Sequence, residues 1–304
     1  MIHERADRVT GDAHGLADRP IALGSEAHKT LFCRMLLDSF NPYRPTLLSW
    51  PKLSDAERQR LVGLPIWDIA VQTEANAALR IRSYAEPITD PLLKQAVALN
   101  AFEEKRHKDV LASLVDAYDI KLGPEPSYLE PRDAEWAYMV TGYSECIDSF
   151  FAFGLFEAAK RSGYFPPELV ETFEPIMQEE CRHILFFVNW AAWHRRNLPY
   201  WRKPIFMARV LGVWLFLIRE RIETARDLGG GNSFTMTGHK AMEIELDFAH
   251  LLDLCLSENE RRLARYDARL IRPALVPNVA RLARWLIRLF RGSASPRATA
   301  RGVS

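Results

Sequence analysis

A six-residue pattern occurs twice in this chain and constrains its fold more than any other feature. Residues 102–107 read FEEKRH and residues 178–183 read QEECRH. Each copy places a glutamate three residues before a histidine, and on a helix residues at positions i and i+3 share a face. The second glutamate and the histidine of each copy can therefore bind one ion from the same side of a helix.

Both copies are predicted to lie deep inside helices. Pro91 lies 13 residues before Glu104, and Pro167 lies 13 residues before Glu180. A proline in the first turn is a helix-start signal. At 1.5 Å per residue, each pair is therefore expected about 20 Å inside its helix.

The glutamate–histidine pairs lie in the apolar stripe of their helices. Apolar residues recur at helical spacing through both segments, on the face that carries the pairs. Burying an ionised carboxylate without a partner is costly, so an inward glutamate must be paired, protonated or bound to a metal. The pairs are Glu104 with His107 and Glu180 with His183.

The first glutamate of each copy is expected to point elsewhere. Glu103 and Glu179 are turned about 100° from the second glutamate. We expect both to be surface carboxylates, paired at i+3 with Arg106 and Arg182. Replacing Glu103 should then leave metal binding intact.

Two more helices are expected to supply one glutamate each. The segment 65–85 carries Glu74 in an apolar stripe, 30 residues before Glu104. Folding the chain at the turn 86–91 places the two carboxylates at similar depths on antiparallel neighbours. Glu74 is therefore the third predicted ligand.

On the helix predicted for 134–161, two glutamates compete. Glu145 shares a face with small and aromatic residues, whereas Glu157 lies nearer the end of the helix. We assign Glu145 as the ligand and keep Glu157 as the alternative. Asp148, one turn from Glu145, is expected either to orient a ligand histidine or to lie on the surface.

The composition of the chain argues against several classes of protein. The net charge of +1 over 304 residues gives no general reason to expect a nucleic-acid partner. The four cysteines form no C-x-x-C pair, which argues against a zinc ribbon, a rubredoxin-type iron site or a disulfide framework. The first residues lack the apolar region of a signal peptide, and no apolar run spans a bilayer comfortably, so we expect a cytoplasmic protein.

Four parts of the chain are distinguished by their patterns. We expect an N-terminal arm with short helices in 1–61, a four-helix bundle in 62–199, additional helices packing on the bundle in 200–275, and a basic amphipathic tail in 276–304. The tail contains six arginines and no acidic residue. It is predicted to dock on its own bundle or on a second subunit, to lie on an anionic membrane surface, or to be disordered; docking on its own fold is the commonest case.

These residues together resemble the metal ligands of the ferritin-like di-iron carboxylate superfamily, in which two helices give a glutamate each and two give Glu-x-x-His. The resemblance covers about residues 62–195. It implies an all-α fold: a ferritin-like four-helix bundle carrying a dinuclear metal site, with extra N- and C-terminal helices. The implied ligands are Glu74, Glu104, His107, Glu145, Glu180 and His183.

The donor set suits particular metals. Four carboxylates would neutralise two divalent ions, and oxygen donors with two imidazoles suit iron or manganese better than copper or zinc. The resemblance is closest to the oxygen-activating branch, such as acyl-carrier-protein desaturases and p-aminobenzoate N-oxygenase. It implies an oxidase or oxygenase with two Fe ions, or an Mn/Fe pair, and with Glu104 and Glu180 at the catalytic centre.

Such an enzyme would activate O₂, with electrons from an unidentified donor, to oxidise a small, largely apolar organic substrate. The aromatic residues between Phe150 and Phe156 are the expected contact for that substrate, or else ordinary core.

Two other functions stay open. One is a ferritin- or rubrerythrin-like protein that handles iron or consumes peroxide; the chain is far longer than a bare bundle and lacks a C-x-x-C site, which disfavours it. The other is a metal-free helical protein with buried ion pairs. That protein would need inward Arg or Lys facing the glutamates, and the apolar stripes contain none.

Overall fold

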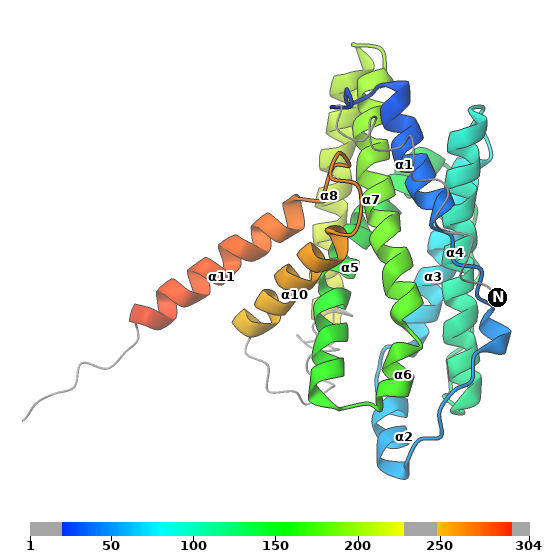
Figure 1. Cartoon of the computed structure of the whole chain (residues 1–304), viewed down its shortest axis with the longest axis vertical. Helices are drawn as coiled ribbons and strands as arrows, with labels where there is room; N and C mark the ends of the chain where they lie inside the picture. The colour runs from blue at the N-terminus through cyan, green and yellow to red at the C-terminus, as the bar shows by residue number, and fades with distance from the viewer. Residues whose placement is uncertain (1–19, 228–247, 294–304) are drawn as a thin grey trace, which may run out of the picture.

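The structure is a computed structural model that describes residues 20–227 and 248–293, and every regular element within those ranges is a helix. The all-α prediction is confirmed. Four long helices lie side by side at the centre (Figure 1). They are α3 (Trp67–Ala85), α4 (Pro91–Ala117), α5 (Ala134–Ser162) and α7 (Glu174–Asn197).

Local signals account for the ends of these helices. At the start of α4, Pro91 follows Asp90, whose side chain accepts a hydrogen bond from the backbone N–H of Leu93. Asp133 caps α5 in the same way. The helix α5 ends at Gly163, which has φ +63°, a conformation that glycine adopts without strain.

One predicted helix is divided in two. Pro167 opens only the short α6 (Pro167–Glu171), and α7 begins at Glu174. The reason is Pro175, which has no N–H to donate to the carbonyl of Glu171 and so interrupts the helical ladder. The prediction of one continuous helix from Pro167 was therefore wrong, and Glu180 lies less deep in its helix than expected.

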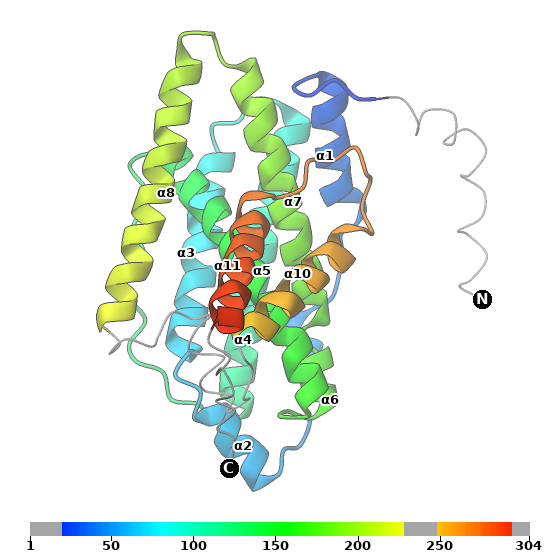
Figure 2. The same cartoon turned by 90° about the vertical axis from the view of Figure 1, so that its left-hand side faces the viewer.

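The remaining helices pack around the central four (Figure 2). On one side α1 packs against α4 and α7, while α10 lies on α5 and α11 lies on α10. The helix α8 packs along α5 and α7. Their bounds are α1 (Glu26–Asp38), η1 (Pro45–Leu47), α2 (Asp55–Val62), α8 (Arg202–Asp227), α10 (Phe248–Leu263) and α11 (Leu275–Ser293).

Helix α2 begins with a capping box, in which Ser54 and Glu57 bond reciprocally. Helix α10 ends at Leu263, and residues 240–247 lie outside the described residues. None of the described helices combines the length and the apolarity needed to cross a membrane.

Helices α5 and α7 approach closely where α5 carries a glycine. A Cβ added to Gly142 would lie 2.1 Å from Cδ2 of Phe187 on α7. Phe187 is itself buried and packs edge-on against Tyr138 and Tyr143, with ring centroids 5.7 and 4.8 Å away. The ring therefore has little room to move away from a larger residue.

We predict that Gly142→Ala destabilises the fold by about 1–3 kcal/mol, because it overpacks this contact. Gly212→Ala is the control, since its Cβ would meet only the edge of Trp136 at 3.2 Å. That change should be neutral or stabilising, because alanine favours a helix over glycine by up to about 1 kcal/mol. Denaturant unfolding of both variants measures the difference, and equal stabilities would contradict the packing.

Candidate metal centre

The structure brings the six predicted ligands together in the middle of the central helices. They form two overlapping groups, and in each group one candidate ligand atom per residue lies within 4.8 Å of the others. Glu104 of α4 belongs to both groups. The first group is Glu74, Glu104, His107 and Glu180, and the second is Glu104, Glu145 and His183.

In the first group, one imidazole nitrogen faces three carboxylates. Nδ1 of His107 lies 3.2 Å from Glu180 Oε1, 3.6 Å from Glu74 Oε2 and 3.7 Å from Glu104 Oε2. This nitrogen is buried and has no hydrogen-bond partner. Its position among three oxygens is the arrangement that a bound cation would satisfy.

The second group repeats this arrangement. Nδ1 of His183 lies 2.7 Å from Glu104 Oε1, and it too is buried without a hydrogen-bond partner. Glu145 contributes a buried Oε1 that also has none. Buried polar atoms nearly always make hydrogen bonds, so three that make none at one place favour an ion. The donor set of carboxylate oxygens and imidazole nitrogens fits a metal, and this cluster could hold one.

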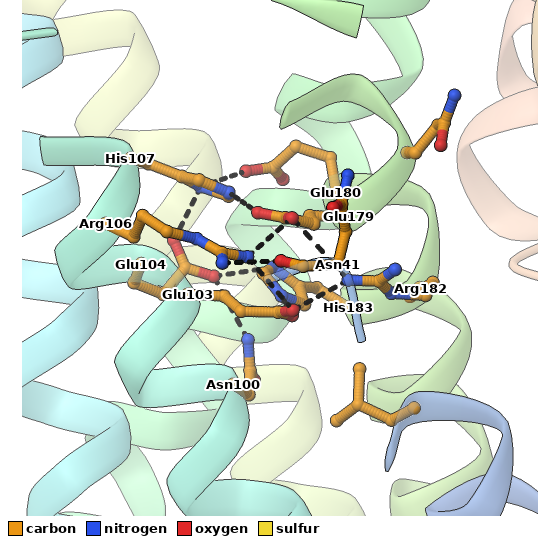
Figure 3. Close-up of polar contacts among 12 residues, drawn as sticks. Asn41, Asn100, Glu103, Glu104, Arg106, His107, Glu179, Glu180, Arg182 and His183 are labelled. Carbon is orange, nitrogen blue, oxygen red and sulfur yellow. Dashed lines mark hydrogen bonds and ion pairs between the residues drawn. The ribbon is translucent and has the colours of Figure 1, made fainter. Parts of the chain in front are cut away.

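The other nitrogen of each histidine is held crosswise by a glutamate from the opposite helix (Figure 3). Nε2 of His107 on α4 lies 2.9 Å from Glu179 on α7, and Nε2 of His183 on α7 lies 2.8 Å from Glu103 on α4. An ionised carboxylate only accepts, so each Nε2 carries the proton and donates. When the imidazole is neutral, each Nδ1 then has a lone pair that could bind a metal.

Glu103 and Glu179 are fully buried, and their prediction as surface carboxylates was wrong. The apolar stripes predicted only one buried face for α4 and one for α7. In the structure these helices are covered on a second side as well, by each other and by the segment 39–43. The signal was present in the sequence, because both copies of the pattern repeat the first glutamate and an arginine three residues later.

The two arginines neutralise this crosswise pair of carboxylates. Arg106 Nη2 lies 2.6 Å from Glu179 and 3.4 Å from Glu103. Arg182 Nη2 lies 2.7 Å from Glu103 and 3.8 Å from Glu179. Two buried acids thus face two buried guanidinium groups, and their charges balance.

Buried cations, which the apolar stripes lacked, are therefore present. They face Glu103 and Glu179 and not the predicted ligands. Within the described residues, no Lys or Arg forms an ion pair with any of the four predicted carboxylate ligands, which are Glu74, Glu104, Glu145 and Glu180.

The segment 39–43 covers the arginines from outside. Arg106 donates to the carbonyl of Asn41 at 2.7 Å and stacks over the ring of Tyr43, 4.1 Å from its centroid. Arg182 donates to the carbonyl of Ser39 at 2.5 Å. The hydroxyl of Tyr43 donates to Glu179 at 3.2 Å. The proline-rich loop after α1 is thus part of the site's support.

Two polar side chains hold the carboxylates of the repeated pattern. Asn100 donates from Nδ2 to Glu104 at 3.1 Å, one turn earlier on α4. Ser149 on α5 donates from its hydroxyl to Glu180 at 2.9 Å. Each bond leaves the other carboxylate oxygen directed at the imidazole of His107.

Burial and mutual repulsion perturb the acids of the cluster. Burial raises the pKa of Glu74 to about 8. Burial, with repulsion from Glu104 and Glu180, raises the pKa of Glu145 well above its usual value. Burial also opposes ionisation of Glu104, but His183 and His107 outweigh it and lower that pKa. These carboxylates thus share too much negative charge for the cations around them, and a divalent ion would displace their protons.

The same carboxylates act on the histidines. Burial by itself disfavours the charged imidazole, but the surrounding glutamates outweigh it, so the pKa values of His107 and His183 are raised well above the usual value. The cluster therefore favours positive charge at its centre, whether this is carried by protons or by a metal.

Three other predicted features have different surroundings. Asp148 pairs with Arg221 at 2.7 Å and accepts from Ser144, so its proposed role in orienting a histidine was wrong. Glu157 pairs with Arg161 at 2.7 Å and belongs to neither group. Phe150, at the start of the aromatic run, is buried against α10 as ordinary core.

No protein-family model, no curated protein and no solved structure matches this chain. What the centre can do chemically therefore follows from its own residues. The centre is suited to binding metal. It combines buried and partly exposed glutamates with two buried histidines, and each imidazole is held by a glutamate from the other helix. Within the described residues, no basic side chain pairs with the four inner carboxylates.

We predict that Glu103→Gln and Glu179→Gln each weaken metal binding about 10–100-fold, because each removes the charged acceptor that orients a histidine. Glutamine keeps the size of the side chain and an acceptor oxygen, which favours retention of the fold. Glu168→Gln, at an exposed position on α6, is the matched control. Competition with a chromophoric chelator measures the affinities, and unchanged affinity in both buried variants would contradict the crosswise arrangement.

Proposed function

We propose that α3, α4, α5 and α7 form a ferritin-like bundle that binds two metal ions, and that the protein is an oxidase or oxygenase that activates O₂. The observation that carries this proposal is the pair of imidazoles whose Nδ1 atoms face the carboxylates while their Nε2 atoms are fixed by Glu179 and Glu103. Such support of a ligand histidine is typical of protein metal sites.

Two ions fit the cluster better than one. The two groups each contain their own histidine and overlap at Glu104, so Glu104 would be within reach of both ions. Four ionised carboxylates carry four negative charges, which two divalent ions balance. Oxygen and imidazole donors favour iron or manganese, and neither group contains a cysteine.

When bound and reduced by an external electron donor, such a pair would supply the redox chemistry for reducing O₂ and oxidising an organic substrate. The protein's residues would position and shield it. Asn100 holds Glu104 and Ser149 holds Glu180. The two arginines balance the charge of Glu103 and Glu179.

The centre is closed on one side and less buried on the other. Glu104, His107 and His183 are buried, whereas Glu74, Glu145 and Glu180 are partly exposed. We therefore place the approach of O₂ and of a small apolar substrate at the side formed by α3 and α5. The side covered by the segment 39–43 is sealed by the arginines.

We expect the purified protein to bind about two iron or manganese ions per chain, because two groups of ligands are available. The double variant His107→Ala/His183→Ala should lose most of this metal, since it removes one ligand from each group. His250→Ala, at an exposed position on α10, is the control. Elemental analysis after chelation and reloading makes the comparison, and equal loading in all three proteins would rule out the site.

We expect the ferrous protein to react with O₂ in a single rapid phase that involves about two iron ions per chain. Stopped-flow absorption after mixing with O₂ measures this reaction, with the double histidine variant as the blank. Slow formation of ferric mineral, with many iron ions taken up per chain, would instead support the iron-handling alternative and contradict the oxygenase.

A further inference from the structure

Helix α11 packs on the protein through only part of its apolar surface. Ala280 is buried, and Val276, Ala283 and Ile287 pack beside it against α10 and α5. These residues dock α11 on its own fold, whereas residues 294–304 of the predicted tail lie outside the described residues. The helix nevertheless points away from the central bundle along much of its length (Figure 1).

A second apolar surface on α11 is exposed. We call it the exposed stripe. Val279, Trp285 and Phe290 are 58%, 58% and 69% exposed, although side chains of this kind are normally covered. The spacing of four and three residues keeps the stripe on one side of the helix. Its members are Leu275, Val279, Leu282, Trp285, Leu286, Leu289 and Phe290.

Ion pairs fix the direction in which the exposed stripe points. Arg284 and Arg288 donate to Asp253 of α10 at 2.6 and 2.9 Å. These contacts lie on the polar side of α11 and join it to α10, so the helix cannot turn to bury the stripe without breaking them. The outward orientation is therefore built into the packing.

The charge of α11 is of one sign. It contains no acidic residue, and Arg281 is exposed and donates to Asn278. Among the described residues, Arg281 forms no ion pair. The exposed apolar residues of α8 differ in this respect, because they are interspersed with Arg219, Glu220 and Glu223. Of the two helices, α11 alone combines an exposed apolar surface with purely positive charge.

The exposed apolar side chains and the positive charge of α11 together indicate which kind of partner fits this helix. A nucleic acid would match the charge but would leave the leucines, tryptophan and phenylalanine uncovered. A second copy of α11 would cover them but would bring arginines together. An anionic lipid surface satisfies both, because apolar side chains enter the boundary of the acyl chains while arginines remain with the head groups.

We propose that α11 binds the surface of an anionic membrane through its exposed stripe, so that the protein attaches to the bilayer without crossing it. Tryptophan at position 285 is suited to the depth of the head groups, where aromatic residues are enriched. The proposal concerns attachment alone and holds whichever metal or substrate the central helices bind.

Cosedimentation of the full chain with vesicles tests the proposal. One set of vesicles is pure phosphatidylcholine, and the other is phosphatidylcholine containing phosphatidylserine. We expect binding to the anionic vesicles, much weaker binding to the neutral ones, and a loss of binding as salt is raised. Leu282→Gln/Leu289→Gln should weaken binding at least about tenfold, because two exposed apolar side chains no longer enter the lipid.

Leu211→Gln/Leu215→Gln on α8 is the matched control, since it removes two equally exposed leucines elsewhere. It should leave vesicle binding unchanged. All substituted positions are exposed, and circular dichroism checks that both variants keep their helices. Equal loss of binding in both variants, equal binding to neutral vesicles, or no binding at all would overturn the proposal. So would a dimer in solution that the α11 variant abolishes, because the stripe would then belong to a second copy.

Discussion

Each of the two central histidines is oriented by a glutamate that belongs to the other helix. His107 of α4 depends on Glu179 of α7, and His183 of α7 depends on Glu103 of α4. This reciprocity requires the two helices to lie in one register, because a shift of either would break both bonds. The central arrangement therefore fixes the position of α4 relative to α7, although few other contacts join these helices directly.

This cluster of buried charges would destabilise the fold unless each charged group has a partner. Buried carboxylates need partners, and removing one member of a buried ion pair is strongly destabilising. Arg106 and Arg182 form ion pairs with Glu179 and Glu103. Backbone carbonyl groups of the loop after α1 accept hydrogen bonds from both arginines. The loop thus contacts the arginines, the arginines contact Glu103 and Glu179, and these two glutamates contact the histidines. At the innermost layer the glutamates and histidines form a cluster that could hold a metal ion.

Much of this centre could be predicted from residue spacing. The i and i+3 rule and the apolar stripe identified Glu104, His107, Glu180 and His183, and matching depths brought in Glu74 and Glu145. The structure places all six together.

The remaining features of the centre and of the fold could not be predicted from residue spacing, because they depend on how the helices pack. The roles of Glu103 and Glu179 were missed because a helix surrounded on several sides has more than one buried face, which a single stripe cannot show. The division of α6 from α7 was missed although Pro175 carried the signal. For α11 the pattern predicted an amphipathic helix, but only the structure shows which apolar residues dock and which stay exposed.

The most direct test of the metal centre is anomalous X-ray diffraction from crystals of the protein loaded with iron or manganese. We expect two peaks per chain, about 3.5–4 Å apart, one beside Nδ1 of His107 and the other beside Nδ1 of His183, with Glu104 contacting both. Metal bound elsewhere, or crystals soaked in either metal that show no peak between α4 and α7, would contradict a two-metal centre built from these residues.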